Sequence, residues 1–273
     1  MSKIHPTAII SNDAHLEEGV EVGPYAVIEG NVTIGSGTKI GSNTRILEYT
    51  EIGTNCHVHH GAVIGDIPQD KKYHGEITKT IIGNDNVIRE YVTINRGTEG
   101  GGGKTVIGDK NLIMSYVHIA HDCILGNEII LASYTALTGH VVIEDYACTS
   151  GMVGIHHFCR IGKMAYIGGL SKVTQDVPPY IMADGNPCRY RALNLVGIRR
   201  HNLSPGAIAA LKETFRVLIS EKSGNLSEVI EKFKSSEEYS FSEVKEMVQF
   251  LIERSENHQA RYLENSRSDN AGK

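Results

Sequence analysis

The sequence predicts a triangular parallel β-helix, a form of solenoid, followed by a smaller helical domain. Three observations predict it. An aliphatic residue recurs at every sixth position, a small residue follows most of them after four positions, and a helical period replaces both rules after Val177. A period of six belongs neither to an α-helix nor to an alternating strand. It is typical of solenoids, which place residues far apart in sequence into straight columns.

The aliphatic position of each hexad predicts one short parallel strand and one corner. The first run covers every sixth residue from Ile4 to Ile64, the phase resumes from Ile82 to Ile94, and after a slip of one residue it continues from Ile107 to Val173. Among these 26 hexads, only Thr149 is not Ile, Leu or Val. Three hexads make a coil of about 18 residues, and we expect coils to stack at about 4.8 Å, the spacing of hydrogen-bonded strands.

The second slot of the hexad, four residues after the aliphatic position, predicts how the interior is filled. It holds slim residues such as Ala26, Thr38 and Cys56, so the large aliphatic residue fills the prism and the small one fits near the corner. Glycine often follows the aliphatic residue, as in Ile34-Gly35, and we expect it to adopt left-handed or otherwise awkward dihedral angles at the corner. An ordinary β-sandwich would not hold one phase this long, and the faces of a purely structural prism should be monotonous, which these are not.

Two interruptions break the repeat, at about 70–80 and, in a glycine-rich segment, at about 98–105. Long loops leaving a rigid prism are good places for function. Gly103-Lys104-Thr105 invites comparison with a phosphate-binding P-loop, but that motif opens a helix, whereas Val106-Ile107 begins another strand. We therefore interpret both segments as loops of the β-helix that could close over a substrate.

A helical pattern follows the repeat, so we expect a β-helix over residues 1–186 and a helical domain over 187–273. Ser204-Pro205 predicts a helix start, with Ile208, Leu211, Phe215 and Leu218 on one face. Capping boxes are expected at Asn225 and Ser240. The polar end, 264–273, is expected to be a flexible tail.

Composition excludes several classes of protein. The net charge is −5, which is unlike a basic nucleic-acid binder. Because no apolar run approaches the length of a bilayer span and Met1 leads directly into the first hexad, we expect no stable membrane insertion and no signal peptide. The five cysteines form no CxxC pair, and Cys56, Cys123 and Cys159 fall in the small-residue slot, which indicates core packing in a reduced, cytoplasmic protein.

Five histidines gather between residues 118 and 157 and predict a polar wall on one face of the prism. The 18-residue coil places His121, Gly139 and His157 in one column and Asp122 and His140 in the next, pointing outward. Three interpretations compete. The wall could be merely solvated, or His118, His121 and His140 could bind zinc. Alternatively, a histidine beside a carboxylate, near backbone N–H groups, could serve as a general base in acyl transfer.

The motifs at these positions resemble those of the UDP-N-acetylglucosamine O-acyltransferases of lipid A synthesis, which are hexapeptide-repeat acyltransferases. The matching segments are 68–73, 88–98, 118–123, 137–140, 151–159 and 175–180. The resemblance implies a left-handed β-helix, a homotrimer with sites between neighbours, and no cofactor or metal. It also implies transfer of an (R)-3-hydroxyacyl chain from acyl carrier protein to the 3-hydroxyl of UDP-N-acetylglucosamine without a covalent intermediate. An acetyl-CoA-dependent sugar N-acetyltransferase of the same fold is the alternative.

The resemblance also implies roles for particular residues. His121 corresponds to the general base, Asp122 to the group that orients it, and the Gly139 N–H to the oxyanion donor. Substrate contacts are implied for Asp70, Lys72, His118, His140, His156, His157 and Arg200, and Gly169 corresponds to the position that limits acyl length. The chain departs from the family pattern at His157, where the best-known members carry Gln, and at Asn95 and Pro187. An acidic carrier protein would need a basic patch, for which Lys172, Arg199 and Arg200 are candidates.

Overall fold

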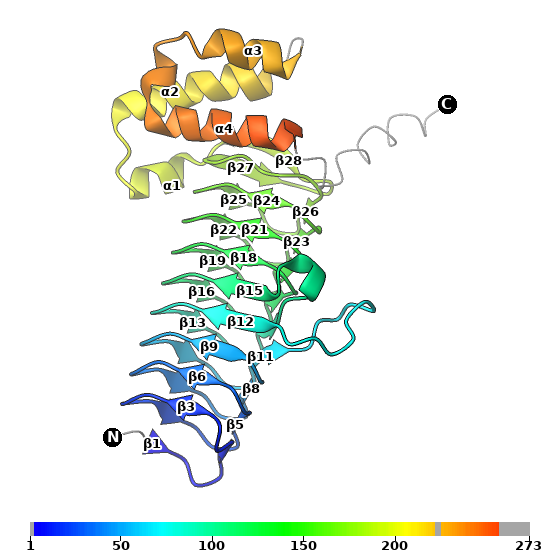
Figure 1. Ribbon diagram of the computed structural model, residues 1–273. Coiled ribbons are helices and arrows are strands. Elements are labelled where there is room, and N and C mark those ends of the chain that lie inside the picture. The colour runs from blue at the N-terminus through cyan, green and yellow to red at the C-terminus, as the bar shows by residue number, and fades with distance from the viewer. Residues whose placement is uncertain (1–2, 222–224, 257–273) are drawn as a thin grey trace.

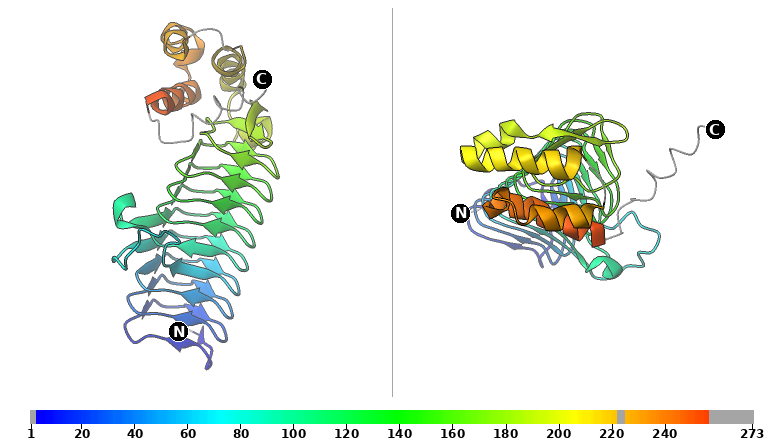
Figure 2. Two further views of the ribbon diagram at one scale, coloured as in Figure 1. Left: turned by 90° about the vertical axis from the view of Figure 1, so that its right-hand side faces the viewer. Right: turned by 90° about the horizontal axis from the view of Figure 1, so that it is seen from above.

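Three parallel sheets form the walls of a prism in the computed structural model, which describes residues 3–221 and 225–256. Figure 1 shows the coils stacked along the prism, and Figure 2 shows its triangular outline from above. In the described residues the sheets have 11, 9 and 8 strands, and from β1 to β26 parallel neighbours within a sheet are three strands apart along the chain. The predicted parallel β-helix is therefore confirmed.

From β1 to β26 each sheet contains every third strand, and β27 and β28 extend the first sheet. The first sheet contains β1 (Lys3–Ile4), β4 (Glu21–Val22), β7 (Lys39–Ile40), β10 (His57–Val58), β13 (Val87–Ile88), β16 (Leu112–Ile113), β19 (Ile130–Leu131), β22 (Cys148–Thr149), β25 (Tyr166–Ile167), β27 (Ile181–Asp184) and β28 (Arg189–Leu193). The second contains β2 (Ile9–Ile10), β5 (Val27–Ile28), β8 (Arg45–Ile46), β11 (Val63–Asp66), β14 (Thr93–Asn95), β17 (His118–Ile119), β20 (Ala136–Leu137), β23 (Gly154–Ile155) and β26 (Lys172–Val173). The third contains β3 (His15–Leu16), β6 (Thr33–Ile34), β9 (Thr50–Ile52), β12 (Lys79–Ile82), β15 (Lys104–Ile107), β18 (Ile124–Leu125), β21 (Val142–Ile143) and β24 (Arg160–Ile161).

The hexad positions form the core as predicted. The aliphatic residues point inward, so Ile46, Ile88 and Leu131 are all 0% exposed, and the small slot is buried with them, as at Ala62. Burying one such aliphatic side chain stabilises the fold by about 1.5–3 kcal/mol. The first coil has no coil beneath it, and Ile4 there remains 50% exposed.

The expectation that glycines after the aliphatic position take left-handed dihedral angles holds at Gly65, with a φ of 80°, but is wrong at Gly35 and Gly41. Positive φ occurs two residues later, as at Asn31 (53°) and Asn43 (54°), whereas Gly35 and Gly41 are absent from the positive-φ residues. Gly35 is needed for a different reason, because a Cβ there would lie 2.6 Å from the backbone carbon of Gly53 in the next coil. Glycines such as Gly35 and Gly41 therefore permit close stacking of coils rather than an unusual turn.

Both interruptions leave from the corner that joins the second sheet to the third, which we call the second corner. The first separates β11 from β12, and the second, with a short 3-10 turn at Glu99–Gly101, separates β14 from β15. Neither loop interrupts the pairing of the strands: Ile64 pairs with Ile94 across the first loop, and Ile94 pairs with Ile119 across the second. The two loops thus project side by side below the corner where β17 turns into β18 (Figure 2).

The strands extend further than the predicted boundary at residue 186. β27 continues the first sheet beside β25, and β28 folds back antiparallel on it, so pairing ends only at Leu193. The helices that follow are α1 (Leu195–Arg200), α2 (Pro205–Phe215), α3 (Leu226–Phe233) and α4 (Ser242–Glu256), with a π-turn at Arg216–Ser220 and a 3-10 turn at Glu238–Ser240. In the described residues, none of these helices is long and apolar enough to cross a membrane. The predicted flexible tail, 264–273, lies outside the described residues.

Two of the three predicted helix starts are confirmed. The Ser204 side chain accepts the Ala207 N–H at 3.1 Å, and the Asn225 side chain accepts the Ser227 N–H at 3.1 Å. The capping box at Ser240 is wrong, because the Ser240 hydroxyl donates to the carbonyl of Glu237 at 2.7 Å and α4 begins only at Ser242. A 3-10 turn occupies the place of the expected cap.

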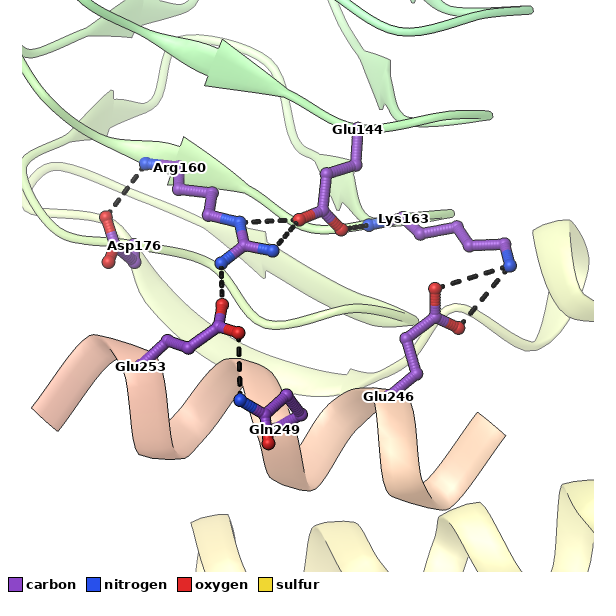
Figure 3. Close-up of polar contacts among 7 residues, drawn as sticks. All are labelled: Glu144, Arg160, Lys163, Asp176, Glu246, Gln249 and Glu253. Atoms are coloured by element: carbon purple, nitrogen blue, oxygen red, sulfur yellow. Dashed lines mark hydrogen bonds and ion pairs between the residues drawn. The ribbon is translucent and has the colours of Figure 1, made fainter. Parts of the chain in front are cut away.

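Helix α4 is fixed to the last coils by ion pairs (Figure 3). The Arg160 guanidinium, on β24, donates to Glu144 and, at 2.5 Å, to Glu253 of α4, and it lies 4.5 Å from the centre of the Phe250 ring. Nearer the start of α4, the Lys163 Nζ lies 3.3 Å from a carboxylate oxygen of Glu246. The helical domain is therefore seated on the same part of the prism that carries the histidine wall.

Candidate active site

His121 and Asp122 form a buried hydrogen-bonded pair at the second corner. The His121 Nδ1 lies 2.7 Å from the Asp122 Oδ2, and the two side chains are 10% and 0% exposed. Asp122 adopts a left-handed backbone with φ of 60°, as residues at this corner position do in coil after coil. When Nδ1 donates to the carboxylate, the Nε2 lone pair of His121 is free to accept a proton.

The second loop holds the Asp122 carboxylate from the other side. Thr98 donates its backbone N–H to Oδ1 at 2.8 Å and its hydroxyl to Oδ2 at 2.7 Å. The Asp122 N–H in turn donates to the Thr105 hydroxyl at 2.9 Å. Burial raises the pKa of Asp122, but the hydrogen bonds from His121 and Thr98 outweigh it, so the net pKa lies below the usual range. The carboxylate is thus kept ionised beside the imidazole.

Thr98 and Thr105 were missed as functional residues in the sequence analysis. The hexad repeat does not reach Thr98, which lies in the interruption. The sequence did contain a signal for these two residues. The six-residue repeat resumes at Ile107, so the loop before it must return to the corner directly below Asp122. Loop conformation, which sets the hydrogen bonds, is not encoded in the period.

Gly139 lies one coil above His121 and against its ring. The His140 N–H donates to the His121 carbonyl at 3.1 Å, and a Cβ at Gly139 would lie 2.5 Å from the His121 Cε1. A side chain at residue 139 would therefore displace the imidazole. Among the described residues, the Gly139 N–H has no hydrogen-bond partner, so it can donate to a bound group.

His140 completes the top of the site. Its ring stacks on Phe158 at 4.5 Å and meets the His121 ring edge-on at 5.2 Å, and its Nε2 is 3.8 Å from the Asp122 Oδ2. Burial lowers the pKa of His140, which keeps the ring neutral near pH 7. The columns predicted from the repeat are therefore present in the structure.

Three side chains of the site lie close enough together to hold a metal ion, but they are not the three that were predicted. Ligand atoms of His121, Asp122 and His140 lie within 4.8 Å of one another, whereas the His118 Nδ1 is bonded to the Thr93 hydroxyl at 2.7 Å. Both oxygens of Asp122 already accept hydrogen bonds from Thr98 and His121. This donor set fits an acid–base pair better than a zinc site.

The two loops and the corner enclose a cavity of about 540 Å³. Asp70, Lys72 and Tyr73 of the first loop line one side, and Thr98 and His140 line the other. A second cavity, of about 420 Å³, lies on the third sheet between Asp122 and α4. The structure thus brings Asp70 and Lys72 to the second corner, beside His140.

The remaining predicted residues are more widely spread. His156 and His157 lie one coil above His140, with their rings in edge contact at 5.1 Å. His118 is on β17, where burial, followed by the charge of His121, lowers its pKa. Gly169 follows β25 at the corner between the first and second sheets, and Arg200 is on α1, with its charge near Cys148 of the first sheet. Within one chain, Gly169 and Arg200 therefore do not join the His121–Asp122 pair, because they belong to other corners.

The cysteines are all free thiols. Burial raises the pKa of both Cys123 and Cys159 to about 12, so both remain protonated near neutral pH. Because the thiolate is the reactive form, neither is suited to act as a nucleophile, in agreement with their predicted packing role.

Comparison with known proteins first identifies the class of protein to which the chain belongs. Residues 13–47, 31–66 and 104–139 match the family model of the bacterial transferase hexapeptide repeat, and residues 176–259 match that of the second domain of UDP N-acetylglucosamine O-acyltransferase. The protein is thus a hexapeptide-repeat transferase with a helical second domain.

Individual relatives define the family. Acyl-[acyl-carrier-protein]–UDP-N-acetylglucosamine O-acyltransferase from Alkalilimnicola ehrlichii is 46% identical over 86% of this chain and 90% of its own length. The one from Aliarcobacter butzleri is 44% identical over 92% of this chain and 96% of its own. The chain therefore belongs to the acyl-[acyl-carrier-protein]–UDP-N-acetylglucosamine O-acyltransferase family and is an acyltransferase.

Solved structures agree with this assignment. A UDP-N-acetylglucosamine acyltransferase from Campylobacter jejuni superimposes with a TM-score of 0.86 at 40% identity, over 92% of this chain and 96% of that one. The enzyme from Francisella novicida gives a TM-score of 0.86 at 37% identity, over 90% of each chain. The fold is accordingly the left-handed parallel β-helix with a C-terminal helical domain.

Proposed function

We propose that this enzyme transfers an (R)-3-hydroxyacyl chain from acyl carrier protein to the 3-hydroxyl of UDP-N-acetylglucosamine, the first step of lipid A biosynthesis, in the cytoplasm. The relatives are named for the acyl carrier protein donor and the UDP-N-acetylglucosamine acceptor. The observation that carries the mechanism is the buried His121–Asp122 pair beneath the free N–H of Gly139.

In the proposed reaction, His121 is the general base. Its Nε2 takes the proton of the sugar hydroxyl while that oxygen attacks the thioester carbonyl. The Gly139 N–H donates to the oxyanion of the tetrahedral intermediate, and collapse expels the carrier thiol, which recovers the proton from His121. Asp122 holds Nδ1 and stabilises the imidazolium that forms during transfer.

The substrate contacts are proposed from their place in the fold. Asp70 and Lys72 line the cavity beside His140, so they are placed to bind the sugar nucleotide. His118, His156 and His157 extend the polar wall along the same corner. Lys172, Arg199 and Arg200 are exposed, so they are available to an acidic carrier protein.

We propose that Gly169 sets the length of the acyl chain. It is exposed, and a Cβ there would meet its nearest atoms, the Gly151 carbonyl and the Ser150 hydroxyl, at 3.4 Å. A side chain can therefore be accommodated without displacing the backbone. Gly169→Met should shift preference toward shorter hydroxyacyl donors in a carrier-protein panel, and unchanged selectivity would refute the assignment.

The proposed function is tested by acyl transfer from hydroxyacyl carrier proteins to UDP-N-acetylglucosamine and to its 3-amino analogue. We expect O-acylation of the hydroxyl substrate and dependence on the carrier protein. Turnover of acetyl-CoA without carrier protein, or reaction with the amino analogue alone, would contradict it.

A further inference from the structure

A single residue of the second loop, Thr98, forms hydrogen bonds with the Asp122 carboxylate. Its backbone N–H and its hydroxyl reach the two different oxygens, at 2.8 and 2.7 Å. Because the Asp122 side chain is 0% exposed, water cannot replace these bonds. One loop residue therefore defines the plane in which the carboxylate lies.

The loop is itself built around Thr98. The Thr98 carbonyl accepts the N–H groups of Gly101 at 3.1 Å and Gly103 at 2.8 Å, which closes the loop on that residue. A Cβ at Gly101 would lie 2.1 Å from the Asp122 Cγ, so the loop backbone packs directly against the carboxylate. Glycine at residue 101 is thus required by this contact.

We propose that Thr98 is a positioning residue for the reaction and acts through Asp122, an inference that rests on the proposed function of the His121–Asp122 pair. A carboxylate bonded at both oxygens cannot rotate, so its bond to Nδ1 fixes the imidazole with Nε2 directed at the acceptor hydroxyl. Because Thr98 also lines the cavity shared with the first loop, the loop that contacts substrate is the loop that orients the base.

The first test is a pair of substitutions at Thr98. Thr98→Val keeps the shape and the backbone N–H but removes the hydroxyl bond, and we expect kcat to fall by about tenfold, the size expected for losing one hydrogen bond to a charged group. KM should change little, since the hydroxyl touches Asp122 rather than substrate. Thr98→Ser retains the hydroxyl and should restore most of kcat. A valine variant with wild-type kcat would overturn the inference.

A double-mutant cycle then tests whether Thr98 acts through Asp122. In an Asp122→Asn background the carboxylate is absent, so Thr98→Val should have little further effect on kcat. If Thr98→Val lowers kcat by the same factor in both backgrounds, Thr98 does not act through Asp122 and the inference fails.

One glycine of the loop supplies a steric test, and a glycine outside the loop supplies its control. Gly101→Ala places a methyl group against the Asp122 carboxylate and should lower kcat, whereas a Cβ at Gly154, on β23, meets nothing within 4 Å, so Gly154→Ala should behave as wild type. Melting temperatures identify any variant that fails to fold. If His121→Ala and Asp122→Asn retain turnover, the proposed function fails. If they lose it while Thr98→Val and Gly101→Ala keep it, only the positioning role fails.

Discussion

At the residue scale, two residues of the candidate active site, Asp122 and His140, adopt an unusual backbone conformation. Asp122 has a φ of 60° and His140, one coil above, has a φ of 63°. Non-glycine residues rarely adopt this conformation. Here the repeat imposes it at most corners, so the fold supplies the strained geometry and the buried Thr105 hydroxyl, which accepts the Asp122 N–H, secures it. The pair is therefore held in place before substrate arrives.

Burial of neutral histidines predicts that stability falls as the pH drops below about 6.5. Burial lowers the pKa values of His118 and His140 from 6.5. In the unfolded chain these imidazoles are protonated as the pH falls through their ordinary pKa, whereas in the folded chain they are protonated only at a lower pH. Between the two pKa values only the unfolded chain gains protons, which favours unfolding.

Urea denaturation from about pH 8 to about pH 5 measures this effect. The double variant His118→Asn/His140→Asn should show a flatter loss of unfolding free energy with decreasing pH than the wild type. Equal slopes for the two proteins would show that these histidines do not carry the pH dependence.

At the element scale, the hexad sets strand, corner and coil, and most of this could be predicted from the sequence. Each of the 26 aliphatic positions falls in a strand from β1 to β26. The columns of His121 and Asp122 follow from the same period. The position of the glycine-rich loop could be predicted from the sequence, but its conformation could not, because the hydrogen bonds from Thr98 to Asp122 depend on a local conformation that no repeat specifies. The cap at Ser240 failed and the antiparallel strand β28 after residue 186 was not predicted for a similar reason, since a 3-10 turn and a returning strand replaced the simplest continuation.

Close stacking of coils predicts that Gly35→Ala destabilises the prism. The added Cβ would lie 2.6 Å from the Gly53 backbone, whereas at Gly154 a Cβ meets nothing within 4 Å. Overpacking of this kind costs roughly 1–3 kcal/mol. Chemical denaturation should show this loss in unfolding free energy for Gly35→Ala and a much smaller change for Gly154→Ala. Similar values for the two variants would argue against the stacking role.

At the scale of the whole molecule, the predicted substrate residues are divided among different corners of one prism. His121 is at the second corner, whereas Gly169 is at the corner between the first and second sheets and Arg200 is on α1 beside the first sheet. A neighbouring copy could bring those residues to the pair. We therefore propose a homotrimer with one site in each cleft between chains.

Sedimentation equilibrium should give three times the chain mass of 29.9 kDa. Co-refolding His121→Ala with Arg200→Ala should restore part of the activity that each variant lacks, because mixed trimers contain clefts in which both residues are intact. An active monomer, or no recovery on mixing, would contradict shared sites.

The central claim, that His121 is the base of the reaction, is tested most directly by the kcat of His121→Ala. A positioned general base contributes about 10²–10⁴-fold, and we expect a loss of that size with an unchanged melting temperature and unchanged binding of UDP-N-acetylglucosamine. A correctly folded His121→Ala enzyme with a kcat near that of the wild type would contradict the account.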